Sequence, residues 1–250
     1  MERYANNIAV LIATLLLNVA VAPLSMADEC ESATADIGSL ISDAEKGDAV
    51  AQYKLSLAYT RGDGVESDKA ESIKWRRKAA EQGHKRAQYF LGRAYFKGEG
   101  VAVDKAEAAK WYRKAAEQGF SPAQYSIGSM YFNGEGVSQD RQEATNWYRK
   151  AAEQGHAKAQ YMLGRMYYNG ECVEVDMRAS AEWFLKAAEQ GHAQAQCCLG
   201  WLYSHGEGVD EDKDAAMMWY RKAAEQGDEI AEHNLGRIET KTLECHSEQE

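Results

Sequence analysis

Apolar and polar positions along the chain repeat every 36 residues, and no insertion breaks the register. Each period opens at a glycine, and these are Gly47, Gly83, Gly119, Gly155 and Gly191, with a half period opening at Gly227. In the second period, Ala87, Leu91 and Tyr95 fall at helical spacing and make one apolar stripe. Such a period indicates two-helix units that stack side by side, because no unit of this size buries its apolar face alone.

Start and stop signals divide each unit into two helices. The first helix of the second unit ends in the loop 97–101, whose glycines permit the positive φ of a sharp reversal. The second helix closes with Lys-Ala-Ala-Glu-Gln-Gly, in which the glycine is a left-handed stop. It opens at an aspartate that can accept the unpaired N–H groups of the first turn, namely Asp68, Asp104, Asp140, Asp176 or Asp212. In the first three units a glutamate follows three residues later, which predicts a capping box.

Large aromatic residues and very small residues recur at fixed places in the units. The second helices carry Trp75, Trp111, Trp147, Trp183 and Trp219, each followed by paired alanines such as Ala115 and Ala116. The first helices carry Gly92, Gly128, Gly164 and Gly200. Small residues let neighbouring helices approach closely, so we predict that the tryptophans pack in the core and do not hold a cofactor.

These elements predict an all-α, right-handed α-α superhelical solenoid of twelve helices. Its five repeats span residues 47–82, 83–118, 119–154, 155–190 and 191–226. A segment at 28–46 contains an N-terminal capping helix, and 227–240 forms a C-terminal capping helix. The polar residues 241–250 are expected to be a disordered tail.

The first 27 residues differ from the repeats and predict a signal peptide. Arg3 precedes an apolar run at 8–22, and Ser25-Met26-Ala27 supplies the small residues that signal peptidase cleaves after. Cleavage after Ala27 predicts a periplasmic or secreted protein without a stable membrane span. An uncleaved anchor is the alternative, although the apolar run is shorter than the roughly 20 residues that a spanning helix needs.

The repeated string resembles a known family. Residues 87–119 contain Ala-Gln-Tyr-x-Leu-Gly-x-x-Tyr-x-x-Gly-Glu-Gly-Val, then Asp and Trp-Tyr-Arg-Lys-Ala-Ala-Glu-Gln-Gly, which is similar to the Sel-one-like repeat of the tetratricopeptide superfamily. The resemblance covers Gly47 to about Gly236, with departures at Ser56, Arg76 and Cys172. It implies an adaptor fold whose exported bacterial members often serve envelope complexes or contact a host, and it implies no particular ligand.

No catalytic signature is present, so the sequence predicts a protein that is not an enzyme and has no cofactor. Serine-nucleophile motifs, phosphate-binding glycine loops and pairs of histidines at helical metal spacing are all missing. His84, His156 and His192 recur one unit apart. Stacked units separate them by roughly 10 Å each, so no shared metal site is expected.

The cysteines leave several pairings open. Cys30, Cys172, Cys197, Cys198 and Cys245 are odd in number, and their spacing does not staple each repeat. Cys30 and Cys245 lie at opposite ends of the predicted stack, where they can pair only between molecules or through tail movement. A bridge from Cys172 to Cys197 or Cys198 is also open.

The net charge of -10 argues against nucleic-acid binding, yet one face of the first helices is basic and aromatic. Counted from each opening glycine, positions three, six, ten, thirteen and fourteen lie opposite the apolar stripe. We call these residues the first-helix face. They are Tyr53, Arg61, Arg86, Tyr89, Arg93, Phe96, Lys97, Tyr125, Phe132, Lys158, Tyr161, Arg165, Tyr168, Trp201 and His205.

A solvent-facing stripe of aromatic residues and arginines is typical of protein-binding surfaces. The resemblance to the tetratricopeptide superfamily implies that this face lines a concave groove. Together they predict an exported adaptor that holds an acidic or carboxylate-bearing protein or peptide in that groove. Packing of the tyrosines between adjacent helices is an equally open interpretation. Non-catalytic glycan or peptidoglycan binding is the alternative function, and weak hydrolysis of envelope material or β-lactams is a more distant one.

Overall fold

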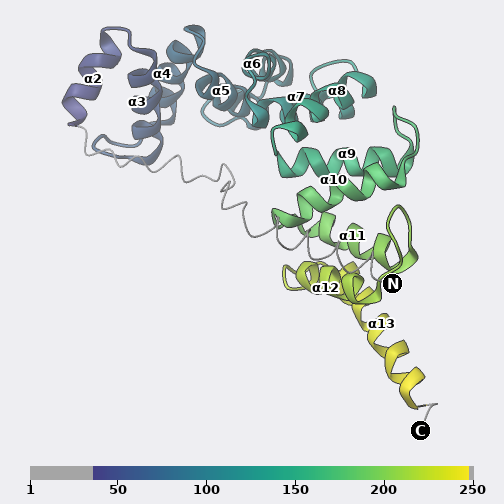
Figure 1. Ribbon diagram of the computed structural model, residues 1–250. Coiled ribbons are helices and arrows are strands. Elements are labelled where there is room, and N and C mark those ends of the chain that lie inside the picture. The colour runs from purple at the N-terminus through teal and green to yellow at the C-terminus, as the bar shows by residue number, and fades with distance from the viewer. Residues whose placement is uncertain (1–35, 248–250) are drawn as a thin grey trace, which may run out of the picture. The chain divides into compact units, whose positions relative to one another are not determined.

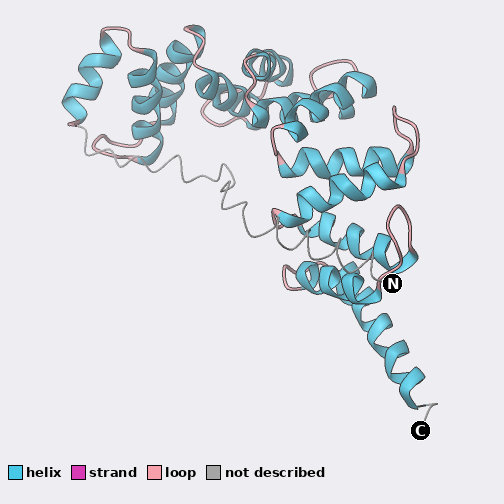
Figure 2. Ribbon diagram, viewed as in Figure 1, coloured by secondary structure: helices cyan, strands magenta, loops and turns pink. Residues whose placement is uncertain are grey.

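The computed structural model describes residues 36–247, with side chains up to Thr240. This part contains only helices and no strand (Figures 1 and 2). The helices are α2 (Ile37–Glu45), α3 (Ala49–Arg61), α4 (Lys69–Glu81), α5 (Lys85–Lys97), α6 (Lys105–Glu117), α7 (Ser121–Asn133), α8 (Arg141–Glu153), α9 (Ala157–Asn169), α10 (Met177–Glu189), α11 (Ala193–His205), α12 (Lys213–Ala224) and α13 (Glu229–Ser247). The twelve helices in this range confirm the predicted solenoid of helix-turn-helix repeats.

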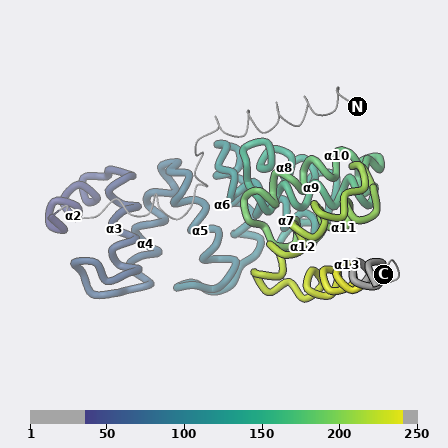
Figure 3. Tube along the Cα trace, turned by 60° about the horizontal axis from the view of Figure 1, so that its bottom comes forward, coloured from purple at the N-terminus to yellow at the C-terminus, as the bar shows by residue number. Residues whose placement is uncertain are grey.

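Each helix packs chiefly against the next helix along the chain. The helices therefore follow one another in sequence order from α2 to α13 (Figures 1 and 3). Within a unit, the first and second helices make the larger contact, and the second helix then packs on the first helix of the next unit. None of the helices in residues 36–247 combines the length and the apolar character needed to cross a membrane. The predicted signal peptide at 1–27 lies outside the described residues.

The predicted aspartate caps are present, but the capping boxes are wrong. The Asp104 carboxylate accepts a hydrogen bond from the Glu107 N–H at 2.9 Å, as an N-cap should. The Asp104 N–H, which a capping box would give to Glu107, instead donates to the Tyr95 carbonyl at 2.9 Å. The Glu107 carboxylate is therefore left to accept from Lys110 at 2.8 Å. The same exchange occurs around Asp68 in the first unit, where Glu71 bonds Lys74.

Close packing of rings on glycines joins the two helices of a unit. Added to Gly164, a Cβ would lie 2.6 Å from the Phe184 ring, and added to Gly92 it would lie 2.9 Å from the Tyr112 ring. Gly128 and Gly200 meet Tyr148 and Tyr220 in the same way. These contacts confirm that the glycines allow close approach of the helices. The tryptophans pack in the core as predicted, with Trp75, Trp111, Trp147 and Trp219 buried and Trp183 half-buried.

Glutamine side chains join one unit to the next, and the sequence analysis did not anticipate them. Gln88 of α5 donates from Nε2 to the Ala80 carbonyl of α4 at 3.0 Å and accepts from Gln118 at 2.7 Å. Gln52, Gln124, Gln160 and Gln196 make the same two bonds. Because Gln88 and its counterparts are buried, each bond satisfies a polar group that water cannot reach.

The C-terminal end differs from the predicted plan. Helix α13 continues through Ser247, whereas we expected a capping helix that ends at Thr240 and a disordered tail from 241. The segment from Lys241 to Ser247 contains no glycine or proline, so nothing in it stops a helix that is already formed. Residues 248–250 lie outside the described part.

Candidate partner-binding face

The tyrosines of the first-helix face pack between units, where Tyr53 is buried and the others are half-buried. Tyr125 stacks on His156 with ring centroids 4.9 Å apart, and Tyr161 stacks on His192 at 4.7 Å. Tyr53 stacks on His84 at 4.7 Å and retains only 6% of its exposure, so its predicted place on the solvent-facing stripe is wrong. The reason is that the next unit places a ring directly over each tyrosine. In the second unit Tyr89 meets Phe120, edge to face, at 5.3 Å.

The histidines of these stacks also cap helices. The His156 Nδ1 accepts a hydrogen bond from the Ala159 N–H at 3.3 Å, and His84 and His192 bond Ala87 and Ala195 in the same way. An imidazole that accepts a hydrogen bond at Nδ1 is favoured in its neutral form, because the protonated ring has no free lone pair there. Burial, with a smaller effect of Lys158, lowers the pKa of His156 to about 4. Burial also lowers the pKa of His84 and of His192.

Two phenylalanines of the face lie beneath cations from the second helix of their own unit. Lys105 lies over the Phe96 ring at 5.4 Å and forms an ion pair with Glu135 of the next unit at 2.7 Å. Arg141 lies over Phe132 at 5.1 Å in the same arrangement. Both phenylalanines are half-buried. They pack against apolar clusters made of residues of their own unit and of the next unit.

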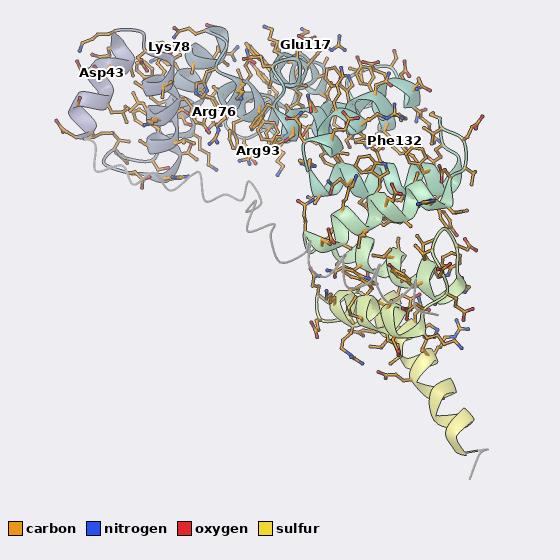
Figure 4. The ribbon with its side chains drawn as sticks, in the orientation of Figure 1. Asp43, Arg76, Lys78, Arg93, Glu117 and Phe132 are labelled. Carbon is orange, nitrogen blue, oxygen red and sulfur yellow. The ribbon has the colours of Figure 1, made fainter. Side chains whose placement is uncertain are left out.

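The arginines of the face remain accessible. Arg93 lies over the Phe90 ring at 4.9 Å and pairs with Glu99 at 3.6 Å, with 39% of its side chain exposed. Arg165 is exposed and lies 5.9 Å from the centre of the Tyr161 ring. In Figure 4, Arg93 lies at the lower edge of α5, opposite the upper edge that carries Lys78 of α4 and Glu117 of α6. The first helices therefore present arginines against aromatic rings.

An aromatic cluster forms where the fourth and fifth units meet. Tyr168 of α9 meets Trp201 of α11 edge to face at 5.8 Å, and Trp201 stacks on His205 at 4.2 Å. The His205 Nδ1 lies 2.9 Å from the Trp201 carbonyl. Tyr168 and Trp201 are half-buried, and His205 is exposed. This cluster is the part of the predicted face that the structure brings together most closely.

The remaining basic residues of the face are spread over several units. Lys97 lies 4.0 Å from Glu99 and is exposed. Arg61 and Lys158 are also exposed, and Arg86 is half-buried. The lysines and arginines of the face thus lie on α3, α5 and α9, and α7 between them carries none.

Sequence reasoning missed Arg76, which is buried next to the face with 6% of its surface exposed. Its Nη2 donates to the hydroxyls of Thr60 at 3.2 Å and Ser72 at 3.4 Å, and its Nε is buried without a hydrogen-bond partner. Burial lowers the pKa of Arg76 and the nearby Arg93 lowers it further, while Tyr53 and Glu99 act in the opposite direction. The signal was visible in the sequence, because Arg76 replaces the tyrosine that follows tryptophan in most units.

The described cysteines are unbridged, and burial changes the acidity of two of them. Cys172, Cys197 and Cys198 are free, so no bridge joins Cys172 to the other two. Burial raises the pKa of Cys197 to about 12 and that of Cys198 to about 11. Within residues 36–240, no cluster of histidine, cysteine, aspartate or glutamate is suited to hold a metal ion. Side chains of Cys30 and Cys245 lie outside the described part.

Comparison with known proteins identifies the repeat. A family model described as Sel1 repeat matches residues 49–84, 85–120, 121–156, 157–192 and 193–228. The crystal structure of c5321, a protective antigen of uropathogenic Escherichia coli with an SLR fold, matches with a TM-score of 0.79 and 42% identity over 83% of this chain. A Sel1 repeat protein from Oxalobacter formigenes matches with a TM-score of 0.72 and 36% identity over 80% of this chain. The chain spans 44% and 58% of the lengths of these two structures. No curated protein matches the sequence.

Proposed function

Because the chain belongs to the Sel1 repeat family, whose members are generally protein-interaction scaffolds, we propose that it is a non-catalytic adaptor. It binds a protein or peptide partner along the first-helix face. The observation that carries this proposal is the placement of accessible arginines and half-buried aromatic rings on that face, from Arg93 of α5 to Trp201 of α11. Rigid aromatic anchors and arginines are the residues that supply most binding energy at protein interfaces.

The partner is an acidic or carboxylate-bearing polypeptide. Arg165 is exposed above the Tyr161 ring, and no carboxylate of residues 36–240 forms an ion pair with it. A guanidinium offers several donors in a fixed plane that match a carboxylate in two-bond geometry. The chain as a whole carries a charge of -10, so its basic residues here favour an acidic partner locally and not polyanions in general.

Export to the periplasm or outside the cell completes the proposal. The support is in the sequence, where the apolar run 8–22 is followed by Ser25-Met26-Ala27. Partner and adaptor then meet beyond the inner membrane, in an envelope complex or at a host contact.

Capture of the partner from native extracts tests the adaptor function. The variant Arg93→Glu with Arg165→Glu reverses two charges on the face and should abolish capture by the mature protein without loss of helicity. Arg178→Glu is the matched control, because Arg178 lies on α10 with 85% of its side chain exposed. Equal capture by wild type and the double variant would refute binding at this face.

Glycan binding is the second candidate, and the cluster of Tyr168, Trp201 and His205 supports it. The face of an aromatic ring that solvent can reach can stack on a sugar ring. Soluble peptidoglycan fragments that bind wild type and fail to bind Trp201→Ala would favour this function. Hydrolysis of peptidoglycan or of a β-lactam is the less favoured variant, and measured turnover would establish it.

A further inference from the structure

The first unit departs from the others at two positions that face each other. In units two to five, a ring of Tyr112, Tyr148, Phe184 or Tyr220 packs on a glycine of the first helix. In the first unit the glycine is replaced by Ser56 and the ring by Arg76. Ser56, Thr60 and Ser72 then form a hydrogen-bonded group, with 2.7 Å between the hydroxyls of Thr60 and Ser72. The first unit thus exchanges an apolar contact for a buried cation.

Within residues 36–240 this buried cation has no ion pair, and the acidic side chain that attracts it, Glu99, is shared with Arg93. Arg76 donates only to neutral hydroxyls there, and no carboxylate of residues 36–240 forms an ion pair with it. Its Nε is buried without a partner. Removing a charge from water without a counter-charge is unfavourable, and four units avoid that cost with an aromatic ring.

A second arginine lies beside the first. The guanidinium carbon of Arg76 lies 5.8 Å from the centre of the Phe90 ring, and that of Arg93 lies 4.9 Å from the same centre. Glu99 is the carboxylate that acts on both arginines, since it pairs with Arg93 at 3.6 Å and attracts Arg76, and its side chain is 44% exposed. An exposed ion pair of this length is weak, so an incoming carboxylate can replace Glu99 at Arg93.

We propose that Arg76 and Arg93, which share the Phe90 ring, form the receptor for a carboxylate of the bound polypeptide. This inference rests on the proposed function and specifies where along the face the acidic group is held. Arg93 makes the first contact from the surface, and Arg76 contributes a partly desolvated guanidinium beneath it. Charge-assisted hydrogen bonds are strongest in such a partly dry site.

The test uses a variant that converts the first unit to the pattern of the second. Ser56→Gly with Arg76→Tyr restores the glycine and tyrosine found at Gly92 and Tyr112. The probes are an amidated hexaglutamate peptide, an amidated hexaglutamine peptide and a neutral hexapeptide with a free C-terminus. Calorimetry measures their affinities for the mature protein, and the ¹⁵N–¹H signals of arginine Nε–H groups report contact with Arg76.

The proposal predicts that the affinity for hexaglutamate is roughly tenfold or more lower in the converted variant than in wild type. It also predicts that the Arg76 Nε–H signal of wild type shifts when hexaglutamate is added. Preference for the neutral peptide with a free terminus assigns the site to a chain end instead of a side chain. Equal affinities in wild type and the converted variant overturn the proposal, and so does a wild type that binds neither carboxylate. These two outcomes concern only the site at Arg76 and Arg93. Capture of the partner from native extracts, which also depends on Arg165, would still succeed, so failure of this site is distinguishable from failure of the adaptor function. Circular dichroism and thermal unfolding establish that the converted variant is folded.

Discussion

Adding one methyl group at Gly164 should destabilise the solenoid. A Cβ there would lie 2.6 and 2.7 Å from carbons of the Phe184 ring, well inside van der Waals contact. Phe184 is only 2% exposed, so its ring has no free space into which to move. Ser56, the only residue with a side chain at this position in the five units, faces Arg76 and not a ring.

Two opposing effects set the size of the change. Replacing glycine by alanine inside a helix favours folding by about 1 kcal/mol. Overpacking a buried contact costs about 1–3 kcal/mol, and the short distances at Gly164 place it near the upper end. Gly164→Ala should therefore lower the free energy of unfolding by roughly 1–2 kcal/mol, the difference between the two.

Urea unfolding followed by circular dichroism measures this change. Gly236→Ala is the matched control, because Gly236 lies in α13 and an added Cβ there meets nothing within 4 Å. The control should show only the favourable helix effect, a gain of at most about 1 kcal/mol. A Gly164→Ala protein that is as stable as wild type, beside a stabilised Gly236→Ala protein, would refute the packing argument.

Three further changes follow from the inter-unit contacts. The pKa of His156 is lowered from 6.5 to about 4, so between these pH values the unfolded chain binds more protons than the folded chain. The free energy of unfolding should therefore fall as the pH drops from 6.5 to 4. His156→Phe, which places at this position the residue found at Phe120, should flatten that part of a pH–stability curve, and an unchanged curve would contradict the role of His156. Gln124→Leu removes two hydrogen bonds, one to the Ala116 carbonyl and one from the Gln154 amide, and each of these partners keeps another bond. At about 0.5–1.5 kcal/mol for each bond, unfolding in urea should show a loss of about 1–3 kcal/mol, and no loss would mean that the glutamine bonds are not stabilising. Cys197 is buried and its pKa is raised to about 12, whereas Cys172 is exposed. Iodoacetamide should therefore label Cys172 before Cys197 in the native protein. Peptide mass spectra that show faster labelling of Cys197 would contradict this.

The fold could be predicted almost completely because its signals are local and repeated. An aspartate at Asp104 caps a helix, and a glycine such as Gly98 ends one, with a left-handed φ of 75°. Five copies of the same pattern then fix the period. The end of α13 could not be placed by this reasoning, since the sequence beyond Thr240 lacks both the repeat and a stop signal.

The candidate site could be predicted only in part, because a helical wheel treats one helix at a time. It correctly leaves Arg165 exposed, yet it cannot show that His84 of the next unit covers Tyr53. Arg76 was recognisable as a departure from the repeat, but its burial depends on the surrounding helices. Contacts between units decide which residues of the face remain available to a partner.

Site-specific photocrosslinking in the native cell tests most directly whether the first-helix face receives a partner. A photoreactive amino acid at position 168 or 201 lies in the aromatic cluster, and one at position 218 replaces Met218, which is 43% exposed on α12. The account predicts a discrete protein adduct from positions 168 and 201 and none from position 218. Adducts that form from position 218 and not from the other two would contradict it.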